Sequence, residues 1–168
     1  MGLGRFHIAR WPRLQPGAVL KRATNRRTSG ANAMALVAEL YRAYAWEVVI
    51  AEPLQGSGLF GEPREVMARF LAPELVEGVL ADRQRSAESG DIGVLDYAPM
   101  WASQDPGASQ LRVEAGAQPT EVRVEFIYPG NGQRVGIDYR LVQTAQGWRV
   151  LDIRSDGGDW LLERLRRE

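Results

Sequence analysis

The feature that most constrains this chain is a pair of alternating segments on either side of Asn131-Gly132. From Val122 to Tyr128 every second residue is apolar, which is typical of a β-strand with one buried face. The Asn-Gly pair favours a two-residue type I′ turn, because both central residues of that turn need positive φ. Residues 121–141 therefore predict an antiparallel hairpin.

The expected turn also predicts which residues oppose each other in the hairpin. On the apolar face the opposed pairs are Tyr128 and Val135, Phe126 and Ile137, Val124 and Tyr139, and Val122 and Leu141. On the charged face Glu125 opposes Asp138 and Arg123 opposes Arg140, and directly opposed like charges are unfavourable. The diagonal pairs Arg123–Asp138 and Glu125–Arg140 would offset this repulsion.

The part of the chain before residue 91 predicts three helices. Apolar residues recur at intervals of three and four from Val37 to Val48, so we expect an amphipathic helix over 33–50 with Asn32 as its N-cap. Shorter apolar stripes over 63–71 and 75–89 predict two more helices, and Gly90 is expected to end the last one.

Two further strands are expected near 111–114 and 148–154, followed by a last helical turn or two from Trp160 to Leu165. Runs of helices followed by runs of strands are typical of the α+β class. The predicted architecture is a set of three N-terminal helices packed on a curved four-stranded antiparallel meander. A short C-terminal helix closes it.

Charge divides the chain into two unequal parts. Residues 1–30 carry seven basic groups and no acid, which leaves 14 basic and 21 acidic groups for the rest of a chain of zero net charge. Pro12, Pro16 and Gly17 disfavour a helix near the start. We expect a basic, disordered tail over 1–32, suited to a targeting segment or to an arm for an anionic partner, and a single domain over 33–168.

Composition excludes several classes of function. The chain has no cysteine, and its single histidine, His7, lies in the tail, so a thiolate metal site and a Ser-His-Asp triad are excluded for the body. Asp82, Glu88 and Asp91 lack calcium-loop spacing and are interpreted as a solvated helix end; we expect no metal and no cofactor. The acidic body is not typical of a nucleic-acid-binding protein, and no apolar run reaches the roughly 20 residues of a membrane span.

The best candidate site lies in the loop over 91–108, which is rich in large aromatic and polar residues and is expected to pack against the body. A carboxylate beside aromatic side chains gains a raised pKa by desolvation and serves as an acid or a base. The structural interpretation is that the aspartates cap turns and the tryptophan closes one end of the core. The candidate ligand-binding residues are Asp96, Tyr97, Trp101, Gln104 and Asp105.

The placement of Asp152 depends on the turn that precedes the last strand. A two-residue turn at Gln146-Gly147 would put Asp152 on the apolar face, opposite Leu141. A three-residue loop would put it opposite Arg140 on the charged face. An unpaired buried carboxylate costs several kcal/mol, so the second register is favoured. It predicts a structural ion pair between Arg140 and Asp152.

Three stretches together resemble a known family. They are the aromatic helix from Leu40 to Tyr44, the loop LDYAPMWASQDP from Leu95 to Pro106, and the closing segment GWRVLDIRSDGGDWLLERL from Gly147 to Leu165. Over residues 33–166 the chain is similar to the bacterial family called domain of unknown function 3828, one of the nuclear-transport-factor-two-like or cystatin-like α+β cones. The resemblance implies a cavity at the wide end of a cone, and no reaction. It also implies export to the bacterial envelope, whereas the sequence as written predicts a cytoplasmic protein unless its start is misassigned.

Three functions from different classes remain open. We expect a domain that binds a small molecule or a partner's segment at the wide end, lined by Tyr97, Trp101 and Gln104. The alternative is a carboxylate-based enzyme of the isomerase, dehydratase or hydrolase type, which needs Asp96 or Asp105 in a deep pocket within hydrogen-bonding reach of a tyrosine. A toxin-immunity protein would instead show an exposed acidic face and no pocket. The chain is expected to be a monomer or a homodimer.

Overall fold

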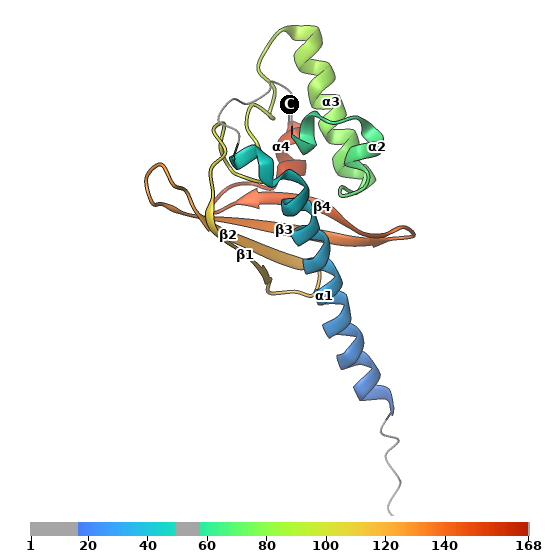
Figure 1. Cartoon of the computed structure of the whole chain (residues 1–168). Helices are drawn as coiled ribbons and strands as arrows, with labels where there is room; N and C mark the ends of the chain where they lie inside the picture. The colour runs from blue at the N-terminus through green and yellow to red at the C-terminus, as the bar shows by residue number, and fades with distance from the viewer. Residues whose placement is uncertain (1–16, 50–57, 168) are drawn as a thin grey trace, which may run out of the picture.

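The computed structural model describes residues 17–49 and 58–167 (Figure 1). Its α-helices precede and follow a four-stranded antiparallel sheet of order β1-β2-β3-β4, which confirms the predicted α+β class. Two short 3₁₀ segments, Ala45–Val48 and Leu59–Gly61, lie between the first two helices. The elements are α1 (Gly17–Tyr44), α2 (Arg64–Met67), α3 (Pro73–Ser89), β1 (Ser109–Ala115), β2 (Glu121–Ile127), β3 (Arg134–Thr144), β4 (Gly147–Ser155) and α4 (Leu161–Arg167).

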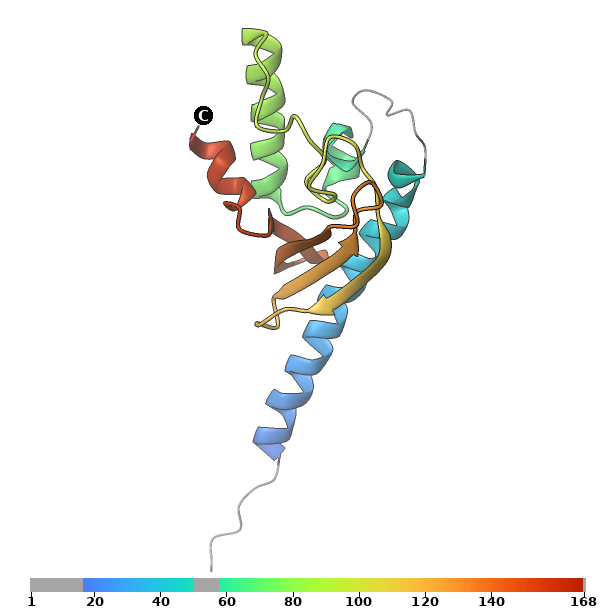
Figure 2. The same cartoon turned by 90° about the vertical axis from the view of Figure 1, so that its left-hand side faces the viewer.

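The first helix begins much earlier than expected. The structure starts α1 at Gly17, so Asn32 is not an N-cap and the part of the expected tail from Gly17 onward is helical. Strong helix formers such as Leu20, Lys21 and Ala23 occupy this stretch, and a proline directly before a helix is compatible with its first turn. The disorder expected for residues 1–16 lies outside the described residues. α1 crosses the sheet, and its N-terminal half extends past the β1 edge (Figures 1 and 2).

The segment between α2 and α3 covers one residue of the β4 edge of the sheet. The amide of Ala72 donates to the carbonyl of Val150, and the amide of Val150 donates to the carbonyl of Phe70, both at 2.8 Å. These bonds satisfy backbone groups that an edge strand leaves open. Directly after them Pro73 begins α3, and Gly90, with a φ of 76°, ends that helix as predicted.

The β2–β3 hairpin is confirmed, but its predicted register is wrong by two residues. The loop has four residues instead of two, because the amide of Tyr128 bonds to the carbonyl of Gln133 and the amide of Gly132 to the carbonyl of Tyr128. Gly132 alone takes a positive φ, while the Asn131 side chain accepts the Gln133 amide at 2.9 Å. The observed apolar pairs are Phe126 with Val135, Val124 with Ile137, and Val122 with Tyr139.

An even shift keeps every side chain on its predicted face but changes the charge pairs. Arg123 now lies directly opposite Asp138 and bonds to it at 2.8 Å, so the predicted opposition of Arg123 to Arg140 does not occur. Arg123 also bonds to Glu125 and to Asp156, and these bonds raise the pKa of its guanidinium. The four-residue loop therefore replaces two repulsive pairs with a network of ion pairs.

The β3–β4 hairpin keeps the favoured register in part, and the alternative with Leu141 opposite Asp152 does not occur. Tyr139 opposes Ile153 and Arg140 opposes Asp152, as the favoured register predicts. A bulge after Arg140 then places Leu141 opposite Val150, so the predicted pairing of Leu141 with Leu151 is wrong. The bulge is needed because the turn closes with Thr144 opposite Gly147, one residue shorter than the predicted loop.

The observed register of the β2–β3 hairpin predicts a specific energetic coupling. A double-mutant cycle on Arg123→Ala and Asp138→Ala should give a favourable coupling of about 0.2–1 kcal/mol. The matching cycle on Glu125 and Arg140 should give a coupling near zero, because these residues are not opposed. Urea unfolding of the four variants of each cycle measures both values, and a larger coupling for Glu125 with Arg140 would contradict this register.

Candidate functional site

The loop over 91–108 packs against the body, as predicted. Val94, Met100 and Trp101 are buried, and Trp101 is only 2% exposed. The amide of Ala98 donates to the carbonyl of Ser103 at 2.9 Å, which folds the loop back on itself. The interpretation of Trp101 as a plug at one end of the core is therefore confirmed.

Asp82 on α3 anchors the start of this loop. Its carboxylate accepts the amides of Val94 and Leu95, each at 3.1 Å, and pairs with Arg85 at 3.3 Å. Asp82 is 3% exposed, so its interpretation as part of a solvated helix end is wrong. Nothing in the sequence spacing indicated that Asp82 would accept hydrogen bonds from a loop that begins twelve residues later.

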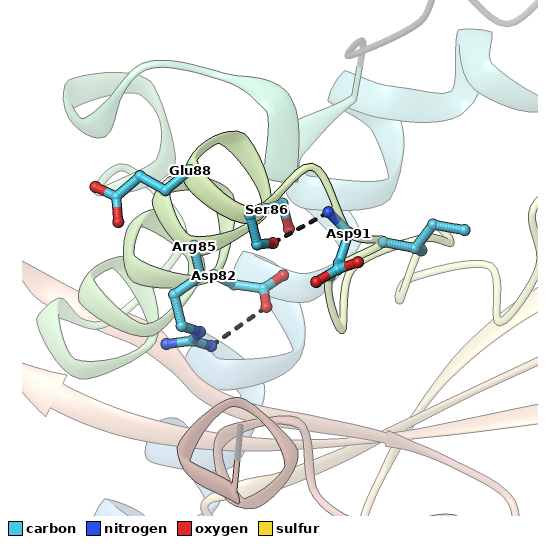
Figure 3. A pocket seen from close by; sticks show the side chains of 8 residues that line it. Asp82, Arg85, Ser86, Glu88 and Asp91 are labelled. Carbon is cyan, nitrogen blue, oxygen red and sulfur yellow. Dashed lines mark hydrogen bonds and ion pairs between the residues drawn. The ribbon is translucent and has the colours of Figure 1, made fainter.

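A hollow of about 470 Å³ lies beside Asp82 at the C-terminal end of α3 (Figure 3). Its polar groups are largely engaged with each other, since Arg85 pairs with Asp82 and the Ser89 hydroxyl accepts the Asp91 amide. Nothing in this arrangement points to a ligand. The residues that line it are Asp82, Arg85, Ser86, Glu88, Ser89, Asp91, Ile92 and Gly93.

The five predicted site residues do not form one site. Asp96 and Gln104 lie together, with the Gln104 amide donating to the Asp96 carboxylate at 3.2 Å, at the exposed surface of the loop. Asp105 lies at the surface as well. Tyr97 packs instead under Arg164 of α4, whose guanidinium donates to the tyrosine hydroxyl at 2.7 Å. Only Trp101 reaches the core.

This placement does not meet the requirement of the enzyme hypothesis. Asp96 and Asp105 lie at the surface, and neither forms a hydrogen bond with a tyrosine among the described residues. The hydroxyl of Tyr97 is already held by Arg164. The two aspartates therefore do not lie in the deep pocket that the enzyme hypothesis requires.

The carboxyl group that contacts Trp101 belongs to the half-buried Glu47, which the sequence reasoning missed. The Trp101 indole N–H donates to Glu47 Oε2 at 2.5 Å, and Glu47 Oε1 is buried without a hydrogen-bond partner in the described part of the chain. Burial raises the pKa of Glu47, and the Trp101 indole and the nearby Leu59 amide offset part of that shift. The available signal was one acid within the apolar run from Tyr44 to Ile50.

A relay of hydroxyl groups lies next to this pair. The Tyr41 hydroxyl donates to the carbonyl of Met100 at 2.7 Å and lies 2.8 Å from the Tyr139 hydroxyl, which is then the donor in that second bond. The Tyr41 ring packs edge-on against Trp101, with ring centroids 5.0 Å apart. Burial raises the pKa of both tyrosines, and the nearby Glu47 carboxylate adds to this effect.

A cleft of about 370 Å³ lies where the Trp101 loop, the β2–β3 loop and the end of β4 meet. Most of its walls are polar, and it holds one cation, Arg134, and one anion, Asp156. Ala102 on the rim has a φ of 50°, an uncommon backbone conformation for a residue with a Cβ. The lining residues are Trp101, Ala102, Ser103, Tyr128, Asn131, Gln133, Arg134, Val135, Gly136, Ser155 and Asp156.

Arg140 and Asp152 oppose each other across β3 and β4 but have separate partners. The guanidinium of Arg140 stacks on the Trp160 ring at 3.8 Å, and Arg154 stacks on the same ring at 4.5 Å. Asp152 is buried and accepts the amide of Leu162 at 2.9 Å, which holds the first turn of α4. Burial raises the pKa of Asp152, and the nearby charge of Arg140 offsets part of that shift. The predicted ion pair between Arg140 and Asp152 is not among the ion pairs of the described residues, because Asp152 lies buried against α4 while Arg140 stacks on Trp160.

Comparisons with known proteins give little further guidance. No protein-family model and no curated protein matches the chain. A solved structure of the phospholipid-binding protein from Ralstonia solanacearum, in complex with a phospholipid, is similar with 18% identity and a TM-score of 0.32. That match covers 89% of this chain and 82% of the other, and at this level of similarity it supports no statement on the ligand.

None of the helices in the described ranges has the length and apolar character that crossing a membrane requires. Within residues 17–49 and 58–167, histidine, aspartate and glutamate side chains do not gather in a group of three placed to hold a metal ion.

The environment of Glu47 predicts unequal losses of stability for two substitutions. Glu47→Ala should lower the free energy of unfolding by about 1–3 kcal/mol, because the buried Trp101 N–H loses its acceptor. Glu47→Gln keeps an acceptor and should cost less. Since burial raises the pKa of Glu47, folding favours its protonated form, and the wild type should gain stability relative to Glu47→Gln as pH falls from neutral through that raised pKa. Denaturant unfolding at several pH values measures this, and an unchanged difference between the two proteins would contradict it.

Asp82 offers a test of how the loop is held. Asp82→Ala removes the acceptor of two amides and should lower the free energy of unfolding by about 2–4 kcal/mol. The exposed Asp91→Ala on the same hollow is the matched control and should change it by less than about 0.5 kcal/mol. Equal effects of the two substitutions in urea unfolding would show that Asp82 does not anchor the loop.

Proposed function

We propose that this chain is a small-ligand-binding domain and that the cleft beside Trp101 is its binding site. The observation that carries the proposal is the meeting of three separate segments around one recess: the loop at 101–103, the β2–β3 loop with the start of β3, and the end of β4. Concave sites with a few convergent polar groups on a rigid sheet are the usual form of a small-molecule site.

The lining indicates the chemical class of the ligand. Ser103, Asn131, Gln133 and Ser155 supply hydroxyl and amide groups, and Tyr128 supplies an aromatic surface. The single cation and anion of the cleft are already paired, Arg134 with Glu125 at 3.0 Å and Asp156 with Arg123 at 2.7 Å. A ligand that suits this site is small and polar, with hydroxyl or amide groups and little net charge, such as a polyol, a sugar, a nucleoside or a zwitterionic amino acid.

Two details support a preformed site. Asp156 uses Oδ1 for Arg123, and its Oδ2 lies at Gly136, where a Cβ would collide with that carboxylate and with the guanidinium. The glycine therefore lets the ion pair lie flat against the strand at the base of the cleft. The amide of Asp156 donates to the carbonyl of Gly136 at 3.0 Å, which fixes the end of β4 against β3. The polar groups are thus held by the sheet before any ligand arrives.

The other hypotheses receive less support. A toxin-immunity protein would lack a pocket, whereas the surface has a cleft beside Trp101 and a hollow at the end of α3. The enzyme alternative needs a buried aspartate, and both of its candidates lie at the surface. Membership in the domain of unknown function 3828 family stays a prediction of the sequence, and it would agree with a ligand site of unassigned chemistry.

A thermal-shift screen tests the proposal with a panel of sugars, polyols, nucleosides and amino acids. A ligand present at 100 times its Kd stabilises the native state by about 2.7 kcal/mol, so a binder should raise the Tm of the wild type clearly. Gln133→Trp, an exposed loop position on the cleft, should fill the recess and abolish the shift. Asp156→Asn should weaken binding roughly fivefold, the equivalent of about 1 kcal/mol.

Ser89→Ala, in the hollow at the end of α3, is the matched control and should bind as the wild type does. The proposed location of the site would be contradicted if Gln133→Trp bound a compound found in the screen with unchanged affinity. The ligand class would be wrong if no member of the panel raised the Tm.

A further inference from the structure

β1 is the open edge of the sheet. Among the described residues it pairs with β2 alone, whereas the opposite edge is partly closed by the backbone of Phe70 to Ala72. Both faces of β1 are largely exposed, and Leu111 is one of few large apolar side chains on the described surface, at 36% exposure. An unpaired strand edge is a template for pairing with another strand.

The direction of the backbone hydrogen bonds between β1 and β2 determines which residues of β1 point their amides and carbonyls away from the sheet. The Gly116 amide donates to the carbonyl of Glu121 at 2.8 Å, toward β2. Because amides alternate in direction along a strand, Glu114 and Arg112 also bond toward β2. Val113 and Ala115 then point their amides and carbonyls away from the sheet, where another strand would meet them.

The side chains of these residues divide between the two faces of the sheet. Val113 lies opposite Val124 and packs against the core. Arg112 lies opposite Glu125 and Glu114 opposite Arg123, so both belong to the charged face. β1 therefore carries one positive and one negative side chain, two residues apart, on the exposed face of an open edge.

We propose that this edge pairs with the β1 edge of a second copy of the chain, as antiparallel strands related by a two-fold axis at Val113. This pairing opposes Val113 to its own copy and gives the outward amide and carbonyl of Val113 a partner. It also opposes Arg112 of each chain to Glu114 of the other, so that two attractive charge pairs flank the axis. Two four-stranded sheets would join into one continuous sheet.

The charges select this register over its neighbours. A two-fold axis at Arg112 would oppose Arg112 to itself, and an axis at Glu114 would oppose Glu114 to itself, both like-charge pairs. A two-fold axis between two neighbouring residues would place an outward-pointing residue of one chain opposite a residue of the other chain whose amide already bonds to β2. Among the axes within 112–114, Val113 is thus the one that satisfies both backbone and charge.

The first helix projects beyond the same edge of the sheet, where the second copy of the chain would lie. α1 contacts β4, β2 and β1 in crossing the sheet, and its N-terminal half continues beyond the β1 edge (Figures 1 and 2). A strand added to that edge would therefore lie beside the projecting part of the helix. A two-fold axis perpendicular to the sheet places both copies of this helix on the same face. The inference does not depend on the ligand proposed for the cleft.

Sedimentation equilibrium of the full chain over a dilution series tests the proposal. The wild type should show a concentration-dependent dimer. Arg112→Glu and Glu114→Arg should each weaken self-association roughly tenfold or more, because two attractive pairs become two repulsive ones.

An equimolar mixture of the two variants should form a heterodimer. The edge of the Arg112→Glu variant carries two acidic side chains, and the edge of the Glu114→Arg variant carries two basic ones. In the proposed register each acidic side chain then faces a basic side chain of the other chain, so both attractive pairs return. The mixture also controls for folding, because a variant whose β1 edge had unfolded would not associate with the other.

Val113→Pro is a second variant that acts through the backbone. It removes one outward amide, at a place where an edge strand tolerates proline, and should abolish the dimer. Because Val113 also packs against the core, the monomer should lose some stability, and its circular dichroism spectrum checks that the fold is kept. Hydrogen exchange should show protection of the Val113 and Ala115 amides that falls on dilution. A wild type that stays monomeric at every concentration, variants that associate like the wild type, or a mixture that forms no heterodimer would each overturn the proposal.

Discussion

The fold depends on a buried relay of hydrogen bonds that joins its three parts. Tyr139 of β3 donates to Tyr41 of α1, and Tyr41 donates to the backbone of the loop at Met100. The sheet, its main covering helix and an otherwise irregular loop are thereby held at one point, beside the Trp101–Glu47 contact. Buried hydroxyl groups are costly without partners, so the relay favours one arrangement of these parts. The cleft takes one wall from the loop that this relay fixes.

Local patterns predicted the elements of this fold well. The alternation from Val122 to Tyr128 and the stop at Gly90 each rest on interactions within a few residues, and both are confirmed. The exact pairing of the strands was not predictable in the same way. The Asn-Gly signal assumed a two-residue turn, but a side-chain bond from Asn131 and the ion pairs of Arg123 favour a longer loop. Energies of this size, roughly 0.2–1 kcal/mol each, decide a register without leaving a clear pattern in the sequence.

The candidate site was only partly predictable for a related reason. Trp101 was identified because a large aromatic residue in a loop must find cover, and the cleft lies beside it. Its acceptor, Glu47, lies 54 residues away in the sequence, and the other cleft walls come from the ends of β-strands. Contacts between distant segments follow from the packing of the whole chain. The side chains of Asp96 and Gln104 are chemically suited to bind a ligand, but in the structure they bond to each other at the surface.

The two edges of the sheet differ in how far their backbone groups are hydrogen-bonded, and this difference affects assembly. Phe70 and Ala72 bond to the backbone of Val150 in β4, whereas among the described residues β1 pairs with β2 alone. A sheet with two free borders is able to recruit chains without end, as fibrils do. In a dimer joined through β1, each outer border would be a β4 strand whose Val150 already has backbone partners. The contact at Val150 therefore makes the addition of a further strand at that border less favourable.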